Sequence, residues 1–176
     1  GSDGNASSHR ATFSVETGRR LAENPLLDFA FLSLEQHYDA VSARNVARGL
    51  ADADAAPDLL VRIPPISTDG PDAARERVRE VLDLGADGVV IPHVMSLEEA
   101  RTALSFFEGV DVWSPQNRDG TVVALLIVED PEVFGELQAI ADLPGYSGLL
   151  CGIGSLTAAL GGDREAAEAI ALDVLE

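Results

Sequence analysis

The feature that most constrains this chain is the alternation of short apolar runs with amphipathic helical segments, clearest between Val122 and Gly161. The run from Val122 to Val128 is short, apolar and rich in β-branched residues, which predicts a parallel strand buried on both faces. An acidic turn, a helix, a second strand, a glycine-rich turn and a further helical segment follow. This order predicts an α/β fold with a parallel sheet and crossover helices.

The same alternation extends toward the N-terminus. Helical signals cover residues 15–23, 38–51, 71–84 and 96–107, and strand signals cover residues 29–34, 59–63 and 88–91. Gly85 is a typical helix stop, and Ser96 with Glu99 is a typical helix start. We expect one α/β domain over residues 11–176, preceded by a disordered tail at residues 1–10 whose first Gly-Ser is typical of a cloning scar.

Two polar positions follow neighbouring predicted strands. Glu129 ends the run 122–128, and the turn Gly152-Ile153-Gly154-Ser155 ends the next strand. Ligands and catalytic groups gather at the carboxyl ends of strands in α/β sheets, so both positions indicate one site. Asp130 has a local explanation as a helix cap, whereas Glu129 has none. A buried carboxylate needs a cation or hydrogen-bond donors; the alternative is a solvated carboxylate bonded to local backbone.

Composition excludes several classes of function. The 30 acidic and 12 basic residues give a net charge of −18, which repels nucleic acid and anionic membranes. All 12 basic residues are arginine, so the chain cannot use a Schiff-base lysine, pyridoxal phosphate or a Walker-type loop.

No apolar run approaches the roughly 20 residues of a membrane span, and we expect a cytoplasmic protein. Cys151 lies in an apolar run, which predicts a buried, unreactive thiol.

Four motifs follow one another at predicted strand ends. They are LLVRIP at 59–64, GADGVVIPHV at 85–94 with SLEEA at 96–100, IVE at 127–129 and GIGSL at 152–156. Together they resemble the HpcH/HpaI aldolase and citrate lyase β-subunit family over most of residues 14–162. The resemblance implies a (β/α)8 TIM barrel, a divalent magnesium, manganese or cobalt ion, and a homo-oligomer. It also implies that a carbon–carbon bond is cleaved or formed through a pyruvate-like enolate or related acyl carbanion.

The resemblance assigns roles to individual residues. Arg62 would bind the substrate carboxylate and stabilise the enolate oxygen, Glu129 would be a metal ligand, and Gly152, Gly154 and Ser155 would contact the substrate. The chemistry of arginine agrees, because its planar guanidinium can donate two hydrogen bonds to a carboxylate. The alternative for Arg62 is a structural salt bridge.

The chain departs from the family pattern at two places. Ser155 stands where the family has an aspartate. A hydroxyl is a poor ligand for a hard dication, so we expect weak metal binding. Serine also suits a helix N-cap.

The second departure concerns the acid/base residue. The family ends an early strand with Asp-x-Glu-His, where this chain has Ser33-Leu34-Glu35-Gln36-His37. An ungapped alignment puts Gln36 on the histidine, whereas a one-residue shift recovers His37. We take His37 as the acid/base candidate because histidine as a residue type suits proton transfer near neutral pH. The alternative is an ordinary strand-end histidine. His93 also follows a predicted strand, where a side chain can line the same site, but we interpret it as a turn residue.

The length is short for a complete barrel. Eight βα units need on the order of 250 residues, whereas 176 residues supply about five or six units. The sequence leaves open whether segments are missing, the chain is truncated, or a reduced barrel is completed by a partner chain.

The sequence predicts an aldolase-type lyase that acts on a 2-oxo acid or related carboxylate through a metal-stabilised enolate, with His37, Arg62 and Glu129. The alternative is a diverged family member without metal-dependent aldolase activity, which serves as a binding or scaffold subunit or as a metal-free enzyme on an anionic ligand. A third possibility is a doubly wound sheet that binds phosphate at the Gly152 turn.

Overall fold

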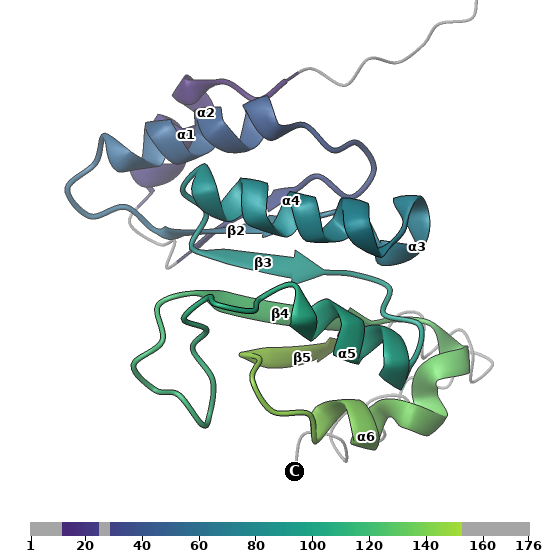
Figure 1. The fold of residues 1–176 in the computed structure, drawn as a ribbon. Coiled ribbons are helices and arrows are strands. Elements are labelled where there is room, and N and C mark those ends of the chain that lie inside the picture. Colours follow the sequence, from purple (N-terminus) through teal and green to yellow (C-terminus); the bar gives the residue numbers. More distant parts are fainter. Residues whose placement is uncertain (1–11, 25–28, 153–176) are drawn as a thin grey trace, which may run out of the picture.

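The computed structural model describes residues 12–24 and 29–152, and these form a five-stranded parallel sheet with helices packed against it (Figure 1). The strands are β1 (Phe29–Ser33), β2 (Asp58–Arg62), β3 (Gly88–Ile91), β4 (Val123–Val128) and β5 (Gly148–Cys151). The predicted tail at residues 1–10, the turn residues Gly154 and Ser155, and the helix expected after them lie outside the described residues.

The strands lie in the order β1-β2-β3-β4-β5, and every neighbouring pair is parallel. A doubly wound sheet reverses its strand order at a switch point, and the described strands contain no reversal. The doubly wound alternative is therefore wrong for the described part of the chain. The sequential order is that of consecutive strands in a (β/α)8 barrel, as predicted.

The helices follow the predicted positions to within a few residues. They are α1 (Val15–Ala22), α2 (Ala40–Ala51), α3 (Ile66–Asp69), α4 (Pro71–Asp83), α5 (Leu97–Ser105), the 3-10 helix η1 (Pro131–Glu136) and α6 (Leu137–Ala141). The hydroxyl of Ser96 accepts a hydrogen bond from the backbone N of Glu99 at 3.0 Å, and Gly85 has a φ of 107°, so both predicted helix boundaries are confirmed. Within the described residues, no helix has the length and apolarity to cross a membrane.

The two faces of the sheet differ. One face packs against the helices around a large buried core that includes Val61, Val89 and Leu126. In Figure 1, α4 and α5 lie in front of the strands on this face. The second apolar cluster contains only strand residues, namely Leu60, Val90, Ile127, Val123 and Leu125. A sheet with helices on one face and only strand side chains on the other has the layering of a barrel wall.

The edge strands leave apolar side chains of this second face exposed. Phe31 pairs in register with Leu60, and Leu150 pairs with Ile127, so all four side chains belong to the same face. Phe31 is 48% exposed and Leu150 is 47% exposed. In a closed barrel these positions line the interior, so the described strands form part of a barrel wall.

Helices α1 and α2 approach each other through two glycines. A Cβ added at Gly49 would lie 2.1 Å from the carbonyl oxygen of Val15 and 2.8 Å from the Cα of Gly18. These are backbone atoms, which cannot rotate away as a side chain can. Glycine is therefore required at this crossing because the two helix backbones leave no room for a Cβ atom. The backbone angles of Gly49 do not themselves require glycine.

We expect Gly49→Ala to destabilise the fold. Overpacking of this kind costs about 1–3 kcal/mol, more than the roughly 1 kcal/mol that alanine gains over glycine inside a helix. Urea unfolding followed by circular dichroism should show a lower midpoint. Gly135→Ala is the matched control, because a Cβ at Gly135 has nothing within 4 Å. Equal shifts in the two variants would contradict this account of the crossing.

Candidate active site

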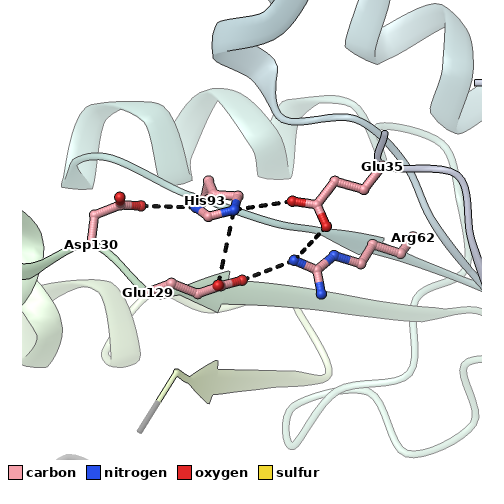
Figure 2. A network of polar contacts seen from close by, with 5 residues as sticks. All are labelled: Glu35, Arg62, His93, Glu129 and Asp130. Carbon is pink, nitrogen blue, oxygen red and sulfur yellow. Dashed lines mark hydrogen bonds and ion pairs between the residues drawn. The ribbon is translucent and has the colours of Figure 1, made fainter. Parts of the chain in front are cut away.

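The carboxyl ends of four neighbouring strands bring five polar side chains together. Arg62 is the last residue of β2, Glu129 directly follows β4, and Asp130 comes next along the chain. Glu35 and His93 lie in the segments that follow β1 and β3. Figure 2 shows their side chains joined in one network of polar contacts.

Backbone hydrogen bonds continue between the chain segments beyond the strand ends and fix the base of the site. The backbone N of Leu34 donates to the carbonyl of Arg62 at 2.8 Å, and the backbone N of Val94 donates to the carbonyl of Ile127 at 3.0 Å. The backbone N of Gly152 donates to the carbonyl of Val128 at 2.9 Å. Each of these pairs flanks a site residue, so the site is built on the rigid part of the sheet.

Strand periodicity explains why Arg62 and Glu129 meet. Arg62 lies two residues after Leu60, and Glu129 lies two residues after Ile127. Side chains two apart on a strand point to the same face, and Leu60 and Ile127 belong to the strand-only apolar cluster. The site therefore lies at one end of the face that lines the interior of a barrel.

The guanidinium of Arg62 joins two carboxylates from different strands. Its Nη2 lies 2.8 Å from Oε2 of Glu35 and 2.9 Å from Oε1 of Glu129. The side chains of Arg62, Glu35 and Glu129 are only 20%, 14% and 20% exposed, so water screens these ion pairs less than it screens surface pairs. The Nε of Arg62 is buried and has no hydrogen-bond partner within the described structure. The guanidinium thus retains donor capacity.

The imidazole of His93 lies between carboxylates on both sides. Its Nδ1 is 3.1 Å from Oδ2 of Asp130, and its Nε2 is 3.0 Å from Oε1 of Glu35 and 3.9 Å from Oε2 of Glu129. Burial lowers the pKa of His93, but the hydrogen bond to Asp130 and the charges of Glu129, Asp130 and Glu35 outweigh burial and raise the pKa above its ordinary value. The surroundings favour the imidazolium form.

The backbone of His93 is unusual. Its φ is 50°, and it is the only non-glycine residue with a positive φ in the described part of the chain. Histidine tolerates this left-handed region better than most residues, yet the conformation still carries a cost. The interpretation of His93 as a turn residue holds for its backbone, but its side chain belongs to the site.

The structure brings together some of the predicted site residues. Arg62 and Glu129 are in direct contact. Gly152 lies against Glu129, since a Cβ added there would be 2.9 Å from Cγ of Glu129. His37 is exposed, and none of the polar contacts of the network involves it.

The sequence reasoning did not assign Glu35, His93 or Asp130 to the site. Asp130 occupies the N-cap position of η1 but makes no side-chain cap hydrogen bond, so the predicted capping role is wrong. Its carboxylate contacts His93 instead. The signal that could have indicated these residues is their position, because each follows a predicted strand as Glu129 does.

The described residues do not by themselves fit a divalent metal ion. No group of three or more histidine, cysteine, aspartate or glutamate side chains in the described ranges could hold one. Oε1 of Glu129, the predicted ligand, already accepts a hydrogen bond from Arg62. Cys151 does not add a soft ligand, because burial raises the pKa of its thiol and favours the protonated form. We therefore assign no step of the chemistry to a metal.

Comparison with protein families decides the relationship. The model of the HpcH/HpaI aldolase/citrate lyase family matches residues 31–173. The chain belongs to this family. Family members are generally divalent metal-dependent lyases. No curated protein sequence matches the chain significantly.

Solved structures of related proteins share the fold. An HpcH/HpaI aldolase/citrate lyase family protein from Burkholderia cenocepacia is 22% identical with a TM-score of 0.70, and the match covers 92% of this chain and 71% of that protein. An HpcH/HpaI aldolase from Desulfitobacterium hafniense is 19% identical with a TM-score of 0.69, covering 94% and 70%. The citrate synthase SbnG is 18% identical with a TM-score of 0.66, covering 92% and 69%. At these identities the likeness establishes the barrel-type fold.

We expect Arg62→Met to destabilise the protein by on the order of 2 kcal/mol, since it removes the hydrogen bond to Glu129 and the ion pair with Glu35, both of which are largely buried. The midpoint of urea unfolding measures this effect. Arg79→Met is the control, because Arg79 is exposed on α4 and surface substitutions stay within about 0.5 kcal/mol. A variant Arg62→Met as stable as Arg79→Met would show that the guanidinium does not hold the strand ends together.

Proposed function

We propose that this chain cleaves or forms a carbon–carbon bond in a 2-oxo acid or related small carboxylate through an enolate. Two observations support the proposal. The chain belongs to a family of aldolases and lyases, and a guanidinium with an unpaired Nε lies at the carboxyl ends of the strands. The second observation carries the proposal to this particular site, because a buried donor without a partner is costly and a bound ligand can satisfy it.

Arg62 has two functions in this proposal. Its guanidinium binds the substrate carboxylate and stabilises the negative charge that develops on the enolate oxygen. Glu35 and Glu129 hold the guanidinium in place through Nη2, so its orientation is set before the substrate arrives. Preorganised donors of this kind lower the barrier because they need no rearrangement during the reaction. We keep Gly152, Gly154 and Ser155 as proposed substrate-contacting residues of the following turn.

The role of a metal divides the proposal into two forms. In the first, a magnesium, manganese or cobalt ion binds at Glu129, as the resemblance implies. In the second, a diverged family member acts on an anionic ligand without a divalent ion, as an enzyme or as a binding subunit. The contact between Arg62 and Glu129 favours the second form, because the guanidinium already neutralises the predicted ligand. A homo-oligomeric state and a cytoplasmic location remain proposals in both forms.

Proton exchange at C3 of pyruvate tests the proposal without knowledge of the natural substrate. Formation of the enolate in D2O replaces the methyl protons with deuterium, which proton NMR measures. We expect the full chain to catalyse this exchange and Arg62→Met to slow it about 100-fold or more, as for loss of a donor to a developing oxyanion. Arg79→Met should exchange at the unmodified rate.

The same assay separates the two forms. Exchange that requires added Mg²⁺ and disappears with a chelator would support the metal-dependent form. Exchange that persists in the chelator would support the metal-free enzyme. Absence of exchange under both conditions would contradict an enolate-forming lyase that accepts pyruvate.

A further inference from the structure

We propose that His93 is the group that transfers the proton in this site, with Asp130 as its positioning residue and Glu35 as its second partner. The inference rests on the proposed function, since it names the catalytic acid and base of the same reaction. It differs from the prediction made from sequence, which placed this role on His37. Three observations carry it: the place of the ring, the contacts of its two nitrogens and the conformation of its backbone.

The ring of His93 lies beside the group that would bind the substrate. Nε2 of His93 and Nη2 of Arg62 contact the two oxygens of the same carboxylate, Oε1 and Oε2 of Glu35. Figure 2 shows the imidazole facing Glu35 and Glu129, and these two carboxylates lie between the imidazole and the guanidinium. In the proposed complex, the carbon atoms next to a carboxylate held by Arg62 lie within reach of Nε2, because both side chains contact Glu35 and Glu129. A proton-transfer group must meet this requirement of reach.

The two nitrogens of the ring have different tasks. Asp130 holds Nδ1 at 3.1 Å and thereby fixes the orientation of the ring. The side chain of Asp130 is free for this task because it does not cap the helix that follows it. Nε2 lies 3.0 Å from Oε1 of Glu35, one of the two carboxylates that contact Arg62. Nε2 is therefore the nitrogen that faces the proposed substrate site, and it is the atom that exchanges the proton.

The proton transfer balances as follows. The imidazolium, which the surrounding carboxylates favour, first releases its Nε2 proton to water. Neutral His93 then takes a proton from C3 of the 2-oxo acid onto Nε2, and the electron pair of that C–H bond forms the enolate double bond. The former carbonyl oxygen becomes the enolate oxygen, whose charge Arg62 stabilises. In the reverse direction the imidazolium returns the Nε2 proton to C3, the carbonyl double bond re-forms, and the ring becomes neutral. No oxidant, reductant or other co-reactant is consumed.

The backbone supports a role for this residue in particular. His93 has a φ of 50° and lies between two residues whose backbone is fixed. Pro92 precedes it, and Val94 follows it and donates its backbone N–H to the carbonyl of Ile127 at 3.0 Å. Energetically costly conformations persist where the surrounding structure enforces them, and they cluster at functional sites. His37, by contrast, is exposed and takes no part in the network.

Matched histidine variants of the full chain test the inference. His93→Asn is the milder substitution, because asparagine tolerates a positive φ, and His93→Gln is the second variant. We expect each to lower kcat for deuterium exchange at C3 of pyruvate about 100-fold or more. Oxalate, a mimic of the pyruvate enolate, should bind with a dissociation constant within about threefold of the unmodified value, because Arg62 still binds it. His37→Gln should leave both quantities unchanged.

Asp130→Asn tests the positioning role separately. We expect it to lower kcat while KM for pyruvate stays near its original value, because a misoriented ring slows proton transfer without weakening the bond to Arg62. A purely structural role would instead change KM and oxalate binding together with kcat.

The outcomes distinguish this inference from the proposed function. If the unmodified protein catalyses deuterium exchange and both His93 variants exchange at the same rate as the unmodified protein, the role of His93 is overturned and the lyase proposal stays intact. Loss of exchange in His37→Gln with retention in His93→Asn would return the role to His37. Absence of exchange in the unmodified protein would overturn the lyase proposal and this inference together. Unchanged oxalate binding in the His93 variants shows that their site is folded.

Discussion

The guanidinium of Arg62 is the interaction on which the rest of the site depends. It ends β2 and contacts a carboxylate after β1 and another after β4, at 2.8 and 2.9 Å. Without this cation, Glu35 and Glu129 would face each other as largely buried like charges, which is costly. The same carboxylates also face His93, so Arg62 indirectly sets the position of the imidazole. One positive side chain thus connects the ends of several strands.

The barrel-type sheet explains why these residues meet although they are far apart in sequence. Parallel strands in sequential order carry their carboxyl ends to one edge, and the period of two places alternate residues on the face that carries the second apolar cluster. An apolar layer of Leu60, Val90 and Ile127 lies below the polar network on that face. Such a layer excludes water from one side of the site, which strengthens the electrostatic interactions above it.

The sequence predicted the elements well because local signals determine them: the strand 88–91 and the start of the helix after Ser96 agree with the structure. It also led to Glu129, since a carboxylate at the end of an apolar strand has few structural explanations, and the resemblance to the family led to Arg62. It could not reveal that Asp130 contacts His93, because the contact spans 37 positions and a capping role was a sufficient local explanation. It placed the acid/base role on His37 rather than on His93, because no local signal shows which loop turns toward the site, and the structure leaves His37 exposed outside the network.

Calorimetric titration with oxalate, on protein treated with a chelator, tests the central claim that Arg62 forms a carboxylate-binding site at these strand ends. The account predicts saturable binding by the unmodified chain that Arg62→Met loses, since the guanidinium is the cation that the oxalate meets. Equal affinity in the two proteins, or no binding to the unmodified chain, would contradict it.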